Sequence, residues 1–479
     1  MTVIGLEVST SAAKCILFSP REGIIDAESI RYPREIGDTL SLDPHGVAAA
    51  ALDALKQVVG RNDRKVSAIG LGGTWHSMLL LDGKRQPLGR ISTWADLSAS
   101  GTVSKFRQDA GFVQEYYQKT GCMVHAMYPM FKYRHLTETQ PELAAQVSYL
   151  SSQIEYLFEM LTGEAAVSRC IASGSGMFNI HTLDWDDDLL ELLSLDRRQL
   201  AELKEATDCG SLKESIAAEL GLDAGIPVTV GAADGAMNQV SIGGARRGVM
   251  SFSVGTSAAM RMVADEPKIP ETPSTWCYYL YSGKRLVGAA TQGACNCIDW
   301  FVEKFAAGRS YSELEDAARA LNPENAPYFL PFIYGERCPG WQEDRPGGFL
   351  GLKPDHGLGE LYYSILEGII FNLYQNYNIL TDVAEVPEQI LVSGGIMNSP
   401  FWLQLTSDLF ERELWTTGAT NDSTLGAAIV AWESVHGPVE VQDFVQPTKV
   451  CEPSSPAKTA VYRKRFERYL QLYAGVGER

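Results

Sequence analysis

The chain has 479 residues, which is too many for one hydrophobic core and suits two domains of roughly 200 to 250 residues each. Its net charge of −18 excludes a broad basic face, so we expect no binding to nucleic acid or to an anionic membrane surface. Nine scattered cysteines predict reduced thiols, and we expect no signal peptide and no transmembrane helix. These features favour a cytoplasmic protein with small-molecule partners.

The first half of the chain opens with a predicted hairpin. Strands are expected over residues 2–8 and 14–18, joined by the turn Ser9-Thr10-Ser11. Such a turn can present backbone N–H groups and hydroxyls to phosphate oxygens, although a plain hairpin turn explains the same residues. A later strand over residues 66–71 runs into Gly72 and Gly73.

An acidic turn follows near the middle of the chain. Residues 227–231 are mostly β-branched and bounded by small residues, so Asp234 is expected where a buried strand gives way to a helix beginning near Ala236. A carboxylate at that position can act as a general base. The alternative is that Asp234 only caps the helix.

The second half repeats the order of the first. Strands are expected over residues 249–254 and 258–263 around the turn Gly255-Thr256-Ser257, and a strand over 389–392 precedes Gly394 and Gly395. Strands alternating with helices predict an α/β fold with a parallel or mixed sheet in each domain. Ligands of such sheets bind beyond the carboxyl ends of strands, so we expect the site in the cleft between the domains.

The domain boundary is expected near residues 243–247, which interrupt the pattern and give domains over 1–243 and 244–479. A last amphipathic helix is predicted over residues 457–473. The chain has no GxxxxGK[ST] loop, so any ATP would be bound by the hairpin turns.

Several segments carry a resemblance to a known family. Residues 347–367, GGFLGLKPDHGLGELYYSILE, and residues 127–138, MYPMFKYRHLTE, are similar to the C-terminal and N-terminal signatures of the FGGY family of carbohydrate kinases. The resemblance implies two ribonuclease-H-like domains of the actin-like ATPase superfamily. Gluconate kinases look most similar, through the segments TWAD at 93–96, HAM at 125–127 and GERCPGW at 335–341.

The resemblance also implies roles for individual residues. Asp234 matches the general base, and Glu7 and Asp234 match the carboxylates near Mg²⁺, with ATP as phosphoryl donor. The implied sugar-side residues are Trp75, His76, Trp94, Asp96 and Lys132. The implied nucleotide-side residues are Thr10, Ser11, Lys14, Gly255, Thr256, Gly394, Gly395, Asn398 and Gly426, the last of which close helix packing explains equally well.

The implied reaction is phosphorylation of a sugar acid or sugar hydroxyl, with gluconate converted to 6-phosphogluconate. A substrate carboxylate requires a cation, for which Lys132 is the first candidate and Arg337 the second, although either can hold a structural ion pair.

Two residues depart from the family pattern, since Glu7 replaces aspartate and Ser9 replaces glycine, and Ser98 stands where gluconate kinases usually have arginine. These departures keep two alternatives open. One is a xylulokinase-like enzyme for a pentulose or polyol, and the other is a weakly active pseudokinase that binds nucleotide and sugar. Whether the protein is a homodimer is also open.

Overall fold

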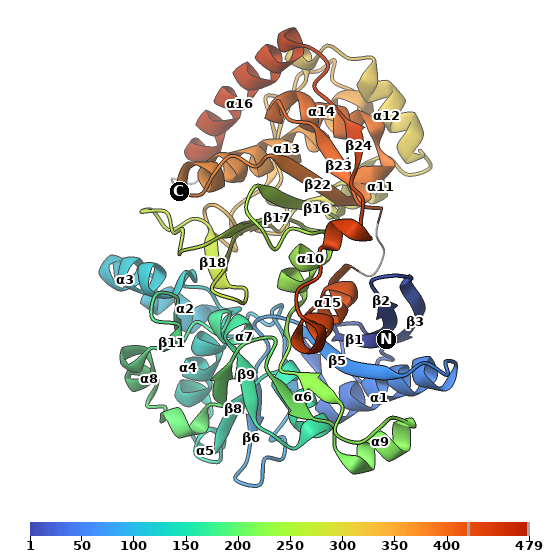
Figure 1. Cartoon of the computed structure of the whole chain (residues 1–479). Helices are drawn as coiled ribbons and strands as arrows, with labels where there is room; N and C mark the ends of the chain where they lie inside the picture. Colours follow the sequence, from blue (N-terminus) through green and yellow to red (C-terminus); the bar gives the residue numbers. More distant parts are fainter. Residues whose placement is uncertain (419–421, 477–479) are drawn as a thin grey trace.

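The computed structural model describes residues 1–418 and 422–476 as two α/β halves, each built on a mixed seven-stranded sheet (Figure 1). In the first half the strand order is β13-β14-β5-β1-β2-β3, with β15 paired to β5. The strands are β1 (Thr2–Val8), β2 (Ala12–Ser19), β3 (Gly23–Arg31), β5 (Val66–Gly73), β13 (Cys209–Ser211), β14 (Pro227–Thr229) and β15 (Ala232–Ala233). The helices that bear on the site are α1 (Pro44–Gly60), α2 (Ser100–Phe106), α4 (Pro129–Thr139), α6 (Gln153–Thr162), α7 (Arg169–Ser173) and α10 (Asp234–Ser241).

In the second half the strand order is β18-β19-β17-β16-β22-β23-β24. The strands are β16 (Val249–Val254), β17 (Ala258–Ala264), β18 (Trp276–Tyr279), β19 (Arg285–Thr291), β22 (Gln389–Gly394), β23 (Leu414–Thr416) and β24 (Thr448–Cys451). The larger helices are α11 (Cys295–Phe305), α12 (Tyr311–Arg319), α13 (Leu358–Val383), α14 (Pro400–Phe410), α15 (Asp422–His436) and α16 (Pro456–Val476).

The two sheets share one pairing scheme. Strand β1 is antiparallel to β2 and parallel to β5, and β16 is antiparallel to β17 and parallel to β22. The predicted α/β fold with a mixed sheet in each half is therefore confirmed. Strand β1 is buried along its whole length because helices α1 and α15 pack against it.

Helix α15 lies in the chain between β23 and β24 of the second sheet but packs against the first sheet (Figure 1). Glycines permit this approach: a Cβ added at Gly5 would lie 2.2 Å from the carbonyl oxygen of Thr424, and one at Gly70 would lie 1.9 Å from that of Ala427. The predicted division after residue 243 falls between α10 and β16. It does not account for α15, through which the second half contributes to the packing of the first.

Helix α10 begins earlier than predicted. Its first residue is Asp234, and the N-cap position belongs to Ala233, which makes no side-chain cap. The alternative in which Asp234 caps the helix is therefore wrong, since its Oδ1 accepts a hydrogen bond only from the neighbouring Gly235 N–H at 2.7 Å. Over residues 1–418 and 422–476, no helix combines the length and apolar character needed to cross a membrane.

Candidate active site

Asp234 is partly exposed at the start of α10, directly after β15. Burial of its carboxyl group and the charge of Glu7 raise the pKa of Asp234 to about 6, against the opposing effects of the Gly235 hydrogen bond and the charge of Arg261. A carboxylate whose pKa lies near neutrality and which keeps some accessible surface has the properties that a general base needs.

Glu7 is a buried carboxylate at the end of β1. Its Oε2 accepts a hydrogen bond of 2.7 Å from the Thr424 hydroxyl of α15 and lies 3.6 Å from the Lys14 ammonium. Because the charge of Glu7 raises the pKa of Asp234, the two carboxylates lie within electrostatic reach of each other. The described residues contain no group of three or more histidine, cysteine, aspartate or glutamate side chains that could together hold a metal ion.

The turn between β1 and β2 is closed by Ser9. The Ser9 hydroxyl accepts hydrogen bonds from the backbone N–H groups of Ser11 at 3.2 Å and Ala12 at 3.1 Å, and it donates to the carbonyl of Ala12 at 3.0 Å. The N–H groups that could bind phosphate oxygens are thus bonded to a side chain that a glycine would not supply. Thr10 lies within this turn and Lys14 follows it on β2, and both are half-buried.

The second turn lies against two glycines and the start of a helix. The carbonyl of Gly255 accepts a hydrogen bond of 2.9 Å from Cys295 N–H, and that of Thr256 accepts one of 3.3 Å from Asn296 N–H. Gly394 has a φ of 90°, and a Cβ added there would lie 2.4 Å from the carbonyl oxygen of Val254, so only glycine fits this position.

A cavity of about 320 Å³ opens beside this turn. Gly395 and Asn398, two of the predicted nucleotide-side residues, contribute to its wall. Its other lining residues include Cys295, Ile298, Tyr311, Tyr362 and Trp402. Apolar and aromatic walls with a few polar groups are typical of a site for a flat heterocycle.

Gly426 does not lie in this cavity. A Cβ added at Gly426 would lie 2.0 Å from the carbonyl oxygen of Met237, so α15 approaches α10 closely at this point. Close helix packing, the explanation left open for this residue, accounts for the glycine without a nucleotide.

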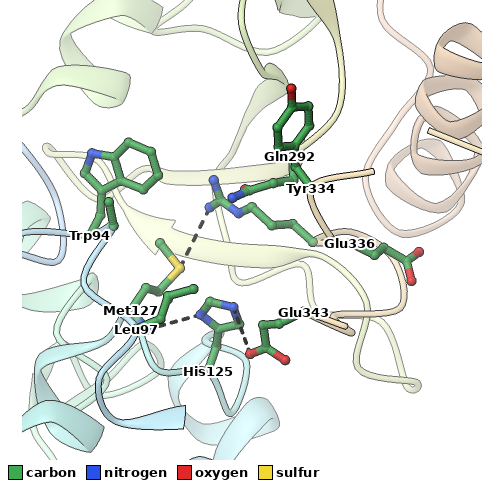
Figure 2. Close-up of a pocket in the computed structure, with 11 residues that line it drawn as sticks. Trp94, Leu97, His125, Met127, Gln292, Tyr334, Glu336 and Glu343 are labelled. Carbon is green, nitrogen blue, oxygen red and sulfur yellow. Dashed lines mark hydrogen bonds and ion pairs between the residues drawn. The ribbon is translucent and has the colours of Figure 1, made fainter. Parts of the chain in front are cut away.

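A second cavity of about 170 Å³ lies between the two halves (Figure 2). Trp94, Leu97, His125 and Met127 line it from the first half. Gln292, Tyr334, Glu336, Arg337 and Glu343 line it from the second half. Of the predicted sugar-side residues, Trp94 therefore lines a partly open space large enough for part of a small polar ligand.

An ionic network joins the halves beside this cavity. Arg107 Nη1 and Nη2 donate to the Glu343 carboxylate at 2.6 and 2.9 Å. His125 Nε2 lies 3.1 Å from the same carboxylate, as Figure 2 shows. His125 Nδ1 accepts from Met127 N–H at 3.1 Å, so the Nε2 nitrogen carries the proton and donates to Glu343. Burial lowers the pKa of His125 well below its usual range, so the imidazole is neutral.

Lys132 is buried and already has partners. Its Nζ donates to the backbone carbonyls of His76, at 3.1 Å, and Thr93. Burial lowers the pKa of Lys132 to about 7, while the charge of Asp96 acts in the opposite direction. This ammonium therefore ties two segments of the first half together.

The side chains of Asp96 and His76 also form hydrogen bonds within the protein. Asp96 accepts hydrogen bonds from the Ser92 hydroxyl at 2.7 Å and from the backbone N–H of Ser98 at 3.0 Å, and the second of these does not depend on the side chain at position 98. Burial lowers the pKa of His76 to about 3, and its neutral ring donates from Nδ1 to the Gly174 carbonyl at 2.7 Å.

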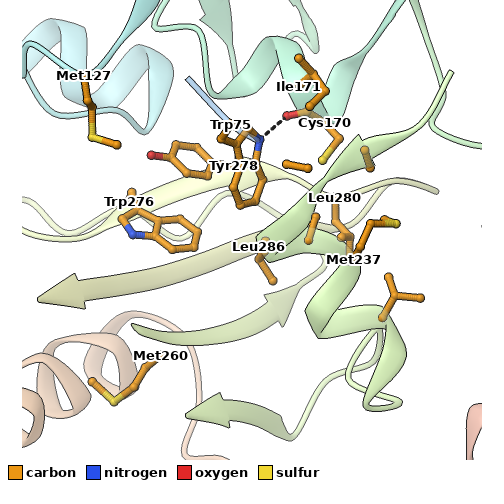
Figure 3. Close-up of a cluster of buried hydrophobic side chains, with 14 of the residues drawn as sticks. Trp75, Met127, Cys170, Ile171, Met237, Met260, Trp276, Tyr278, Leu280 and Leu286 are labelled. Carbon is orange, nitrogen blue, oxygen red and sulfur yellow. Dashed lines mark hydrogen bonds between the residues drawn. The ribbon is translucent and has the colours of Figure 1, made fainter. Parts of the chain in front are cut away.

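Trp75 belongs to an aromatic cluster with Trp276 and Tyr278 (Figure 3). Its indole N–H donates to the carbonyl of Cys170 at 2.9 Å, and its ring centroid lies 4.9 Å from that of Tyr278. A Cβ added at Gly235 would lie 2.9 Å from the Trp75 ring. The tryptophan therefore supports the first turn of α10 and has no N–H left for a ligand.

The structure adds residues that sequence reasoning missed. Arg261, on β17, lies near Asp234 and its Nε has no hydrogen-bond partner within the described part of the chain. Gln292 lines the cavity between the halves, and Glu343 joins them. Glu343 follows the GERCPGW segment by two residues, and this proximity was the only signal that the sequence offered.

The two α/β halves share one strand-pairing scheme, each has a hairpin turn, and the pKa of Asp234 is raised, as is suitable for a two-domain enzyme that transfers phosphoryl groups. Models of the N-terminal and C-terminal domains of the FGGY family of carbohydrate kinases match residues 2–241 and 250–434. The chain belongs to this family and is therefore an enzyme that transfers a phosphoryl group to an alcohol.

Known proteins and solved structures are similar to this chain over nearly its whole length. A gluconokinase of Bacillus subtilis strain 168 is 28% identical over 444 residues, which cover 89% of this chain and 86% of that protein. The crystal structure of gluconate kinase from Lactobacillus acidophilus is 28% identical, with a TM-score of 0.94, and the match covers 100% of this chain and 98% of that one. A ligand-bound xylulose kinase from the same species matches with the same four values.

Proposed function

We propose that this kinase transfers the terminal phosphoryl group of ATP to gluconate, giving 6-phosphogluconate. The observation that carries the choice of acceptor is the near full-length similarity to gluconokinases in sequence and to a gluconate kinase in structure. The cavity between the halves supports a small polar acceptor, because it combines an aromatic face at Trp94 with polar side chains from both halves.

In the proposed reaction, Asp234 accepts the proton of the acceptor hydroxyl as the oxygen attacks phosphorus. The two turns at Ser9-Thr10-Ser11 and Gly255-Thr256 hold the phosphates, with Lys14 beside the first turn. Gly395 and Asn398 line the proposed adenine cavity. The carboxylates of Glu7 and Asp234 are hard oxygen donors suited to Mg²⁺, whose remaining ligands would be water and phosphate oxygens. Bound Mg²⁺ would neutralise phosphate charge.

The proposal is tested by measuring ADP release in a coupled assay with gluconate, xylulose, ribulose and glycerol as acceptors. Gluconate is expected to give the highest kcat/KM. A higher value with xylulose would favour the second candidate, which the equally good match to a xylulose kinase structure supports. A pseudokinase, which the self-bonded Ser9 turn favours, would show no release above background with any acceptor.

Replacing Ser9 by glycine is expected to strengthen ATP binding. The substitution frees the N–H groups of Ser11 and Ala12, which the Ser9 hydroxyl now engages, so the KM for ATP should fall by about 3- to 10-fold. Ser9→Ala is the matched control, because it removes the hydroxyl but keeps Cβ. Equal gains in both variants would assign the effect to the hydroxyl, whereas weaker ATP binding in both would contradict the prediction.

The activity is expected to depend on the protonation of Asp234. A base works only when ionised, and its pKa is raised to about 6, so kcat/KM should fall as the pH drops through about 6. Arg261→Met removes a positive charge that lowers this pKa, so the acidic limb of the profile should move to higher pH. Profiles of both proteins between about pH 5 and 9 check this shift, and coincident limbs would refute it.

A further inference from the structure

The cavity between the halves (Figure 2) has acidic side chains that are already engaged. Glu336 accepts a hydrogen bond of 2.6 Å from the Tyr473 hydroxyl and forms an ion pair of 3.1 Å with Arg345. Glu343 is held by Arg107 and His125. Neither carboxylate is left to neutralise another cation in the cavity wall.

Arg337 also lines the cavity, and neither Glu336 nor Glu343 pairs with it. Its Nε is buried without a hydrogen-bond partner, and its Nη2 contacts only the thioether sulfur of Met127 at 3.8 Å. Within residues 1–418 and 422–476 it forms no ion pair; its guanidinium carbon lies 5.8 Å from the centroid of the Trp341 ring. The Arg337 side chain is half-buried, so an anion in the cavity would pair with its guanidinium with less screening by water than at an open surface.

Other side chains that line this cavity can also donate. The Gln292 amide, the Trp94 indole N–H and the Tyr334 hydroxyl form no side-chain hydrogen bonds within the described part of the chain. A carboxylate group accepts on both oxygens and matches the planar fork of a guanidinium. The free groups of this cavity therefore suit a carboxylate better than a hydroxymethyl group.

The cavity also lies close to the proposed base. The charge of Arg337 contributes to the lowered pKa values of both His76 and Arg261, so its guanidinium is near both side chains. Arg261 in turn borders the first turn of α10: its Nε would lie 3.1 Å from a Cβ added at Gly235, next to Asp234. Arg261 therefore lies between Arg337, in the cavity wall, and the proposed base at the start of α10.

We infer that Arg337 binds the carboxylate of the acceptor, with Gln292 and Trp94 as further donors, and that it sets the preference for sugar acids over neutral sugars. This inference rests on the proposed function and names the residue that gives the kinase its specificity for sugar acids. Lys132 does not take this role, because its ammonium is already bonded to the carbonyls of His76 and Thr93.

The test compares gluconate with glucitol, which carries a hydroxymethyl group in place of the carboxylate. For each protein, the ratio of kcat/KM for gluconate to kcat/KM for glucitol is measured from initial rates. Arg337→Met should lower this ratio by about 10- to 100-fold, chiefly through a higher KM for gluconate, because a charged hydrogen-bonded pair is lost. Arg337→Lys keeps the charge without the fork and should give an intermediate ratio.

Lys132→Met is the matched control, since it removes the other candidate cation. It should lower both rates together and leave the ratio within about 2-fold. A large fall in the ratio for Lys132→Met, or an unchanged ratio for Arg337→Met, would overturn the assignment while gluconate kinase activity itself stands. A wild-type enzyme that phosphorylates neutral sugars but no sugar acid would overturn the proposed function and the carboxylate site together. Thermal melting verifies that each variant is folded. If Arg337→Met does not fold, Arg337→Lys still tests the assignment.

Discussion

Asp234→Asn is expected to lower kcat by about 10²- to 10⁴-fold, the usual contribution of a general base, while the Kd for ATP stays within about 2-fold. The amide keeps the shape of the side chain and can still accept the hydrogen bond from Gly235 N–H, but it cannot accept a proton from the substrate. Steady-state turnover of gluconate and equilibrium titration with ATP measure the two quantities separately.

Asp408→Asn is the matched control for the loss of an aspartate charge. Asp408 is buried in α14, far from the proposed base in the chain, and accepts hydrogen bonds from Ser454 N–H at 2.6 Å and from the Ser454 hydroxyl at 3.0 Å. This variant should unfold at a lower temperature but keep its kcat. If Asp234→Asn retained more than about a tenth of the wild-type kcat, Asp234 would not be the base.

Glu7→Gln is expected to lower kcat/KM for ATP by about 10- to 100-fold and to raise the Mg²⁺ concentration needed for half-maximal activity. The amide still accepts the hydrogen bond from Thr424, so the change removes the negative charge and little else. Because the charge of Glu7 raises the pKa of Asp234, the acidic limb of the pH profile should also move to lower pH.

Two further variants separate charge from position at Glu7. Glu7→Asp keeps the charge but shortens the side chain by one methylene, which takes it out of reach of Thr424. Thr424→Val removes the same hydrogen bond and keeps Glu7 unchanged. Both should be less impaired than Glu7→Gln if charge dominates. Equal losses in all three variants would show that the contact with α15, and not the charge, governs activity.

The sequence predicted those parts of the site that lie where strands end. The hairpin turns and Asp234 follow runs of apolar residues, and the pairing of β1 with β2 and of β16 with β17 places them as expected. The α/β fold of both halves follows from the same local patterns.

Contacts between distant segments were beyond sequence reasoning. Arg107 and Glu343 are 236 residues apart, and no local pattern pairs them. Arg261 lies within a strand of small and apolar residues, so its position near Asp234 depends on how two sheets face each other. Lys132 was a reasonable ligand by charge alone, but only three-dimensional contacts reveal that two carbonyls already occupy its ammonium.

The position of α15 has a consequence for synthesis of the chain. Glu7 is translated near the start, but the Thr424 hydroxyl that holds its carboxylate is translated more than 400 residues later. The N-terminal half can form its sheet as it leaves the ribosome, since domains fold as units from the N-terminus. The edge that carries the proposed phosphate-binding turn stays unfinished until α15 emerges and packs against Gly5 and Gly70. If this turn binds ATP as proposed, a nascent or prematurely terminated chain would lack a finished site, and activity would appear only after nearly all of the chain has been made.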